Sequence, residues 1–158
     1  MNDNDQLDAG FIDGMVMEDS MDSKKTNVFE ANKTYDIHII NLTPDAHPMH
    51  IHLVHFQKVY QYPFDEEEYL KDYTRLNEGK PTKHGFIKKA ENLDPEPYRK
   101  GRNEMPLPHE KMFRDTIDTW PGYVTVIRVR FARTDGRLWN NIKFKDSLFV
   151  IHCHILEH

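Results

Sequence analysis

Two short histidine-rich segments, far apart in the chain, constrain its fold more than any other feature. The first is His47-Pro48-Met49-His50-Ile51-His52, and the second is His152-Cys153-His154-Ile155-Leu156-Glu157-His158. Together they hold six of the ten histidines and the only cysteine. A thiolate between two imidazoles is a set of soft and borderline metal ligands, which suits copper better than a hard cation. If the two segments bind metal jointly, the fold must bring them together.

The composition fits a single domain and excludes several classes of partner. The chain has 158 residues, 38% of them hydrophobic and 30% charged, with a net charge of −5. It has no basic stripe, so we expect no nucleic-acid partner. No apolar run approaches the roughly 18–20 residues that cross a bilayer, so we expect no membrane partner. The acidic N-terminus, Met1 to Asp5, lacks the features of a signal peptide, and the cellular location stays unknown.

Alternating apolar and polar residues predict a chain built mainly of short strands. The predicted strands cover residues 35–40, 50–60, 113–117, 123–131 and 147–151. No repeat and no sustained helical periodicity is present. The pattern predicts an all-β fold, either a sandwich or a small barrel.

The chain divides into an N-terminal segment and one domain. Residues 1–27 are expected to form a frayed end or an edge strand, with a short strand and turn at residues 11–15, and residues 28–158 form the domain. Within it, residues 63–112 are a long, irregular loop insertion rich in proline and charge, of a length that is usually functional. Glu66-Glu67-Glu68 begins a short helix that runs to about Leu76.

Strand geometry assigns the histidines to two faces. On an extended strand, His50 and His52 point the same way, and so do His152 and His154, whereas Cys153 points to the opposite face. We therefore expect Cys153 to share a site with one histidine from each segment. His47 and His158 are the candidates. A set of two histidines and one cysteine is typical of a blue-copper electron-transfer centre.

The remaining histidines of the two segments form a second predicted metal site on the other face. Its donors are His50, His52, His152 and His154. The covalent bonds from Cys153 to its two neighbours connect the sites. Zinc is the main alternative metal, but structural zinc sites normally use more thiolates. A Cys–His nucleophile leaves the surplus of histidines unexplained.

Other motifs carry weaker signals. His38, His55, His84 and His109 are interpreted as structural or solvated residues. Asn41-Leu42-Thr43 matches the glycosylation sequon, as does Asn32 with Thr34, but no export signal supports its use.

The two histidine segments resemble the C-terminal copper motifs of multicopper oxidases, H-P-x-H-x-H and H-C-H-x-x-x-H. The run from His50 to Gln57 and the run from Phe113 to Thr116 are similar to the bilirubin oxidase and spore-coat laccase branch. The resemblance covers residues 28–158. It implies the last cupredoxin domain, a Greek-key β-sandwich, of a three-domain laccase-like oxidoreductase.

The resemblance also implies a role for each ligand. His47, Cys153 and His158 would bind the type 1 copper, which accepts electrons from a small-molecule reducing substrate. His50 would bind the type 2 copper. His52, His152 and His154 would bind the type 3 pair, where O₂ is reduced to water. Cys153, His152 and His154 are thus the residues expected to carry electrons between the copper sites.

Two parts of the family pattern are missing from this sequence. No axial ligand follows His158, and no N-terminal cupredoxin domain supplies the other half of the trinuclear ligands. We therefore interpret the chain as a C-terminal fragment that is inactive as an oxidase by itself, with type 2 and type 3 copper bound only alongside N-terminal cupredoxin domains. The alternatives are an isolated copper-binding or electron-transfer module and a subunit completed by a separate N-terminal partner. Self-association through the uncovered interdomain surface is also expected.

Overall fold

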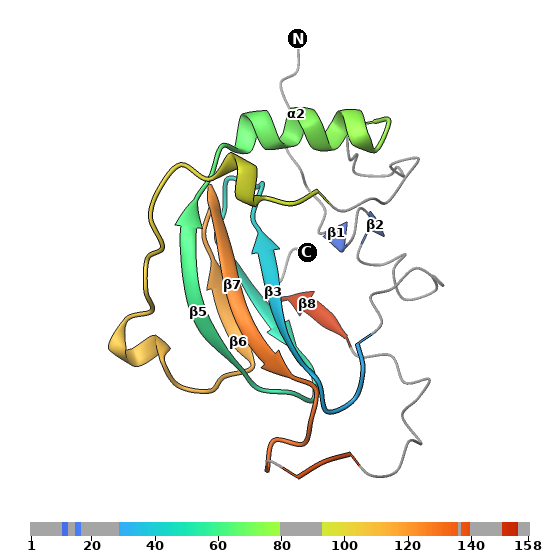
Figure 1. Ribbon diagram of the computed structural model, residues 1–158, viewed down its shortest axis with the longest axis vertical. Coiled ribbons are helices and arrows are strands. Elements are labelled where there is room, and N and C mark those ends of the chain that lie inside the picture. Colours follow the sequence, from blue (N-terminus) through green and yellow to red (C-terminus); the bar gives the residue numbers. More distant parts are fainter. Residues whose placement is uncertain are drawn as a thin grey trace.

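Two three-stranded antiparallel sheets form the main body of the part of the chain that the structure describes. The structure, a computed structural model, describes residues 11–12, 15–16, 29–79, 93–135, 137–139 and 150–154. One sheet has the order β3-β7-β5 and the other β6-β4-β8, and β1 pairs with β2. The strands are β1 (Phe11–Ile12), β2 (Met15–Val16), β3 (Thr34–Ile40), β4 (His47–Ile51), β5 (Phe56–Pro63), β6 (Thr116–Thr119), β7 (Tyr123–Arg130) and β8 (Ile151–Cys153). Figure 1 shows β5, β7 and β3 side by side, with β6 behind them and β8 to the right of β3.

The core lies between the two sheets. Ile127 and Val129 of β7 pack with Phe56 of β5, and this group also contains Ile51 of β4 and Ile117 of β6. The side chains next to Ile127 and Val129 on β7 point to the opposite face of the sheet, because successive side chains of a strand alternate between its two faces. The predicted all-β, cupredoxin-like sandwich is therefore confirmed.

Helix α2 (Glu66–Leu76) lies across one end of the sandwich, at the top of Figure 1. The Asp65 side chain accepts a hydrogen bond from Glu68 N–H at 3.1 Å, which caps the first turn. Tyr69, 3% exposed, packs with Val124 and Val126 of β7. The predicted short helix is confirmed with its bounds. In the described ranges, no helix is both long and apolar enough to cross a membrane.

The prediction of one strand over residues 50–60 is wrong. β4 ends at Ile51, and β5 begins at Phe56 in the other sheet. Between them, Leu53 adopts a positive φ of 67° and turns the chain. Burial stops alternating at this turn, because His52 and Leu53 are both exposed between the buried residues Ile51 and Val54. The predicted strand at 113–117 is displaced to Thr116–Thr119, and residues 147–149 of the last predicted strand lie outside the described residues.

The insertion at residues 63–112 is more ordered than predicted in its described parts. It contains α2 and two 3₁₀ turns, η1 (Glu96–Tyr98) and η2 (Pro108–Glu110). Residues 99–114 run along the free edge of β5, with isolated bridges at Phe64–Arg99, Gln61–Glu104 and Phe56–Arg114. This segment therefore covers a sheet edge that would otherwise expose unpaired backbone groups.

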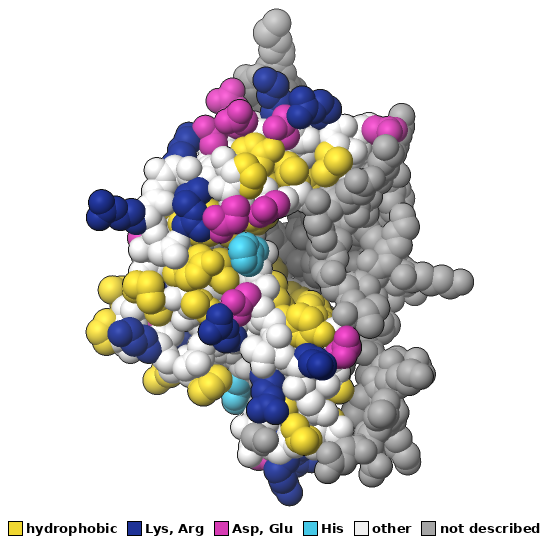
Figure 2. All heavy atoms as spheres, viewed as in Figure 1, with side chains coloured by type: hydrophobic (Ala, Val, Ile, Leu, Met, Phe, Trp, Pro, Cys, Tyr) yellow, Lys and Arg dark blue, Asp and Glu magenta, His cyan; other side chains and the backbone are white. Residues whose placement is uncertain are grey.

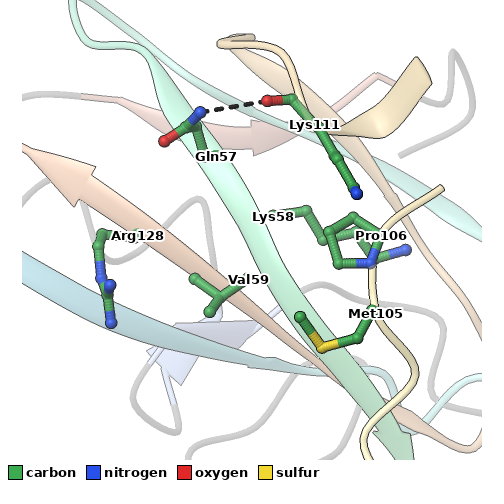
Figure 3. A pocket seen from close by; sticks show the side chains of 7 residues that line it. All are labelled: Gln57, Lys58, Val59, Met105, Pro106, Lys111 and Arg128. Carbon is green, nitrogen blue, oxygen red and sulfur yellow. Dashed lines mark hydrogen bonds between the residues drawn. The ribbon is translucent and has the colours of Figure 1, made fainter. Parts of the chain in front are cut away.

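Between these bridges the segment leaves β5 and forms a shallow pocket of about 330 Å³ (Figure 3). One end is closed by a hydrogen bond from Gln57 Nε2 to the Lys111 carbonyl at 3.1 Å. The lining residues are Gln57, Lys58, Val59, Met105, Pro106, Lys111 and Arg128. They include no histidine or cysteine, so this pocket is separate from the histidine segments.

A partly buried ion pair joins the segment to β5. Lys58 Nζ lies 2.8 Å from Glu110 Oε1, and the Lys58 side chain is only 5% exposed. Leu107 N–H also donates to Glu110 Oε2 at 2.8 Å. Burial favours the neutral carboxyl, but the hydrogen bonds from Lys58 and Leu107 outweigh it and hold the pKa of Glu110 below its ordinary value of 4.5. The ionised form of Glu110 is thus stabilised in the folded state.

Replacing Glu110 with glutamine is expected to lower the free energy of unfolding at neutral pH by about 1.5–3 kcal/mol. Because the folded-state pKa lies below the unfolded one, this contribution is present above about pH 4.5 and is lost as the pH falls through the folded value. Urea denaturation at several pH values should show the two proteins converging in acid. The exposed Glu30→Gln variant is the control. A stability difference that stays constant from neutral to acid pH would contradict the assignment.

Candidate metal centre

The two histidine segments lie on neighbouring strands. β4 is the central strand of its sheet and pairs with β8 in antiparallel register, with His50 opposite His152 and Met49 opposite Cys153. The pairing continues beyond β8, because His154 N–H donates to the Pro48 carbonyl at 2.9 Å. Residues far apart in the sequence are therefore held side by side by backbone hydrogen bonds.

One face of this pair brings a histidine and the cysteine together. His47 Nδ1 lies 3.3 Å from Cys153 Sγ. His47 is buried and Cys153 is half-buried. Two ligands of one metal at about 2.0 and 2.3 Å lie roughly 3.5 Å apart in a tetrahedral site. The observed separation is of this size. His158, the third residue expected here, lies outside the described residues.

The opposite face holds a cluster of imidazoles. Ligand atoms of His50, His52 and His152 all lie within 4.8 Å of one another, and His52 Nε2 is 3.1 Å from His152 Nε2. The His154 ring is adjacent, with centroid distances of 4.6 Å to His152 and 5.1 Å to His50. His52 and His154 are exposed, whereas His50 and His152 are half-buried.

Hydrogen bonds orient two of these rings. His50 Nδ1 lies 2.9 Å from the Asp115 carbonyl and 3.1 Å from Thr116 Oγ1. A carbonyl only accepts, so His50 Nδ1 carries the hydrogen and Nε2 is left to bind a metal. His152 Nδ1 likewise donates to the Cys153 carbonyl at 3.1 Å. This second bond joins the backbone of the cysteine to the imidazole cluster.

Sequence reasoning missed the residues that contact His47. The Asn41 side chain is 5% exposed and bonds Thr43, whose hydroxyl lies 2.6 Å from His47 Nε2. Thr119 Oγ1 donates to the His47 carbonyl at 3.0 Å. The Asn-x-Thr pattern is also an Asx-turn signal, which could have pointed to this role. Because the Asn41 amide is buried and fully bonded, the folded chain does not offer it as a glycosylation acceptor.

Exposed apolar side chains lie next to the imidazole cluster in the sequence, or close to Asp115, whose carbonyl contacts His50. Leu53, directly after His52, is 62% exposed, and Phe113, two residues before Asp115, is 66% exposed. Three residues that precede Phe113 in the same segment, Met105, Leu107 and Met112, are also exposed. Figure 2 shows apolar side chains gathered with Lys and Arg side chains over the segment beside β5. Exposed apolar patches of this kind commonly mark interaction surfaces.

The donor set fits copper. The cysteine side offers one thiolate and at least one imidazole, and the other side offers imidazoles whose spacing allows shared coordination. Thiolate and imidazole ligands suit copper and zinc, whereas carboxylates and carbonyls suit hard cations. The roles of individual residues as ligands stay predictions, but their arrangement on two faces follows the alternation predicted for the strands.

Comparison with known proteins identifies the family. The family model for multicopper oxidases matches residues 2–158. The chain is 33% identical over 120 residues to a laccase of Bacillus stratosphericus, covering 76% of this chain and 17% of the laccase. It is 30% identical over 122 residues to Multicopper oxidase LPR2 of Arabidopsis thaliana, covering 76% and 19%. It is 29% identical over 150 residues to Multicopper oxidase LPR1 homolog 1 of Oryza sativa subsp. japonica, covering 94% and 23%. The chain therefore spans less than a quarter of the length of these relatives, and it belongs to the multicopper oxidase family.

Proposed function

We propose that this chain is a copper-binding cupredoxin domain with a different copper site on each face of the β4–β8 pair. His47, Cys153 and His158 bind a mononuclear type 1 copper. His50 supplies a type 2 ligand, and His52, His152 and His154 supply type 3 ligands. The observation that carries the proposal is the separation of thiolate and imidazoles: Cys153 Sγ is 3.3 Å from His47, whereas the clustered imidazoles lie on the other face.

The protein contributes position and connection. Antiparallel pairing of β4 and β8 places Met49 opposite Cys153 and His50 opposite His152, so one backbone register sets both sites. Cys153 is bonded covalently to His152 and His154, and its carbonyl accepts a hydrogen bond from His152 Nδ1. These links give a short path for electron transfer between the metal sites on the two faces. Copper, when bound, supplies the one-electron redox chemistry that the side chains lack.

The oxidase reaction belongs to a longer assembly in this proposal. A reducing substrate delivers electrons to the cysteine face, and O₂ is reduced where the imidazole cluster is completed by ligands from N-terminal cupredoxin domains. Exposed Leu53, Phe113 and the exposed histidines fit a surface that meets another domain or a second copy of the chain. Alone, the chain acts as a copper-binding and electron-transfer module.

The direct test is a Cu(II) titration of the full chain, followed by absorption and by bound-copper analysis. We expect one copper per chain to produce an intense blue thiolate-to-copper band and a second class of copper to bind without adding to it. His50→Ala with His152→Ala is expected to remove the second class and leave the blue band. His38→Ala, at an exposed position of β3, is the matched control.

Two results would count against the proposal. The first is the absence of a blue band at any copper concentration in a folded chain. The second is loss of the band in the His50 and His152 double variant while the other copper class persists, since this would assign the thiolate to the imidazole cluster.

A further inference from the structure

We propose that Thr43, held by Asn41, is a positioning residue for His47. Its hydroxyl accepts the Nε2–H of the imidazole, which places the hydrogen on Nε2 and leaves the Nδ1 lone pair facing Cys153. The inference rests on the proposed function in one respect, namely that His47 is a ligand of the mononuclear copper. The orientation of the ring itself is argued from hydrogen bonds alone.

The Asn41 side chain makes four hydrogen bonds, which fix its orientation. Its Nδ2 donates to the carbonyls of Asp45 at 2.7 Å and Thr119 at 2.9 Å. Its Oδ1 accepts from Thr43 N–H at 2.9 Å and lies 2.8 Å from Thr43 Oγ1. Carbonyls only accept and a backbone N–H only donates, so the amide cannot be reversed without losing three of these bonds.

The Thr43 hydroxyl has one hydrogen and three close neighbours. Asn41 Oδ1 at 2.8 Å and the Asp45 carbonyl at 3.2 Å are acceptors only. The third neighbour, His47 Nε2 at 2.6 Å, is the one that can donate. If the hydroxyl gave its hydrogen to His47, its oxygen would face two acceptors with no hydrogen between them. Donation from His47 avoids this, because the hydroxyl can then donate to Asn41.

With the hydrogen on Nε2, the Nδ1 atom of His47 is the nitrogen that can bind a metal. A neutral imidazole carries one hydrogen, so Nδ1 keeps its lone pair, and this lone pair is directed at Cys153 Sγ, 3.3 Å away. The backbone of His47 is held as well, through the bond from Thr119 Oγ1 to its carbonyl. A hydrogen bond on the far ring nitrogen is the usual means by which proteins select the metal-binding nitrogen of histidine.

The network is local to the connection between β3 and β4. Asn41 follows the last residue of β3, and Asp45 lies two residues before His47. Asn41 N–H also donates to the Tyr123 carbonyl at 3.3 Å, which ties this connection to the start of β7. The ring of His47 is therefore oriented by the sandwich before any metal arrives.

Nitrogen NMR on the metal-free full chain tests the ring assignment directly. At mildly alkaline pH, the ¹⁵N shifts and long-range couplings of His47 should report the Nε2–H tautomer. Thr43→Val, which keeps the shape but removes the hydroxyl, is expected to shift His47 toward a mixture of tautomers. Thr43→Ser should restore the original spectrum. An Nδ1–H tautomer in the unsubstituted chain, or a Thr43→Val spectrum identical to it, would overturn the proposal.

Copper binding gives the second readout. Loss of a hydrogen-bond partner behind a histidine ligand typically weakens metal binding 10–100-fold, so Thr43→Val should lower Cu(II) affinity at the blue site by at least about tenfold. The reduction potential of the copper at this site should also shift. In Thr43→Ser, the Cu(II) affinity should stay within about twofold of that of the unsubstituted chain. Equal affinity and potential in Thr43→Val would refute the positioning role.

Thr125→Val is the matched control, because Thr125 is fully buried and its Oγ1 has no hydrogen-bond partner. It should leave the His47 spectrum and the copper affinity unchanged. If the NMR result is as expected but no variant or parent shows a blue band, the proposed function fails while the assignment of the His47 ring stands. The copper-binding function and the orientation of the His47 ring are thereby tested separately.

Discussion

Cys153→Ser is expected to abolish the blue absorption of the copper-loaded chain while the imidazole cluster keeps its copper. The band requires a thiolate bound to Cu(II), and a serine hydroxyl is a much poorer ligand for this metal. Serine preserves the size of the side chain and the hydrogen-bonding contact with His47, so the fold and the second site should be little affected. Absorption and electron paramagnetic resonance of the titrated variant provide the measurement.

The arrangement of the ligands on two faces predicts which class of copper is lost and which is kept. Cys153 lies beside His47 on one face, while the ligand atoms of His50, His52 and His152 are grouped on the other. A single substitution should therefore remove one class of copper and spare the other, in a pattern opposite to that of the His50 and His152 double variant. A blue band that survives in Cys153→Ser, or a loss of all bound copper from a folded variant, would show that the sites are not separated by faces.

Phe56→Ala is expected to lower the free energy of unfolding by about 3–5 kcal/mol, the range for removing a buried phenylalanine side chain. Phe56 is fully buried in the core that contains Ile51 and Ile117 of one sheet and Ile127 and Val129 of the other. A domain is typically stable by about 5–15 kcal/mol, so this change removes a large part of the total. Because Ile51 belongs to the strand that carries His50, copper affinity should fall as the core loosens.

Urea denaturation followed by circular dichroism measures this effect, with the midpoint expected to fall and the slope to stay constant. Phe113→Ala is the matched control, because the same side chain is removed from a position that is 66% exposed. Its effect should stay within about 0.5 kcal/mol. Equal destabilisation by the two variants would contradict the placement of the core between the sheets.

Local sequence patterns predicted much of this fold, but they failed at the turn between β4 and β5. The strands around residues 35–40 and 123–131 and the helix from Glu66 were predictable, because alternation and an acidic first turn are properties of short stretches of chain. The turn after Ile51 was not, because Leu53 takes its positive φ without glycine or proline to signal it. The segment that covers β5 was also missed, since its few backbone bridges depend on contacts between distant residues.

The metal centre likewise has some features that local sequence predicts and others that it does not. The sequence by itself determined which side chains share a face, because alternation along an extended strand is local: His50 with His52, His152 with His154, and Cys153 opposite its neighbours. Only the tertiary structure decided that β4 and β8 pair with His50 opposite His152, and that the Thr43 hydroxyl, bonded to Asn41, lies 2.6 Å from His47 Nε2. Strand register depends on how whole strands pack around the common core, and no short stretch of sequence encodes that packing. The Thr43 contact is local, but the Asn41 side chain behind it is held by the carbonyl of Thr119 on another strand.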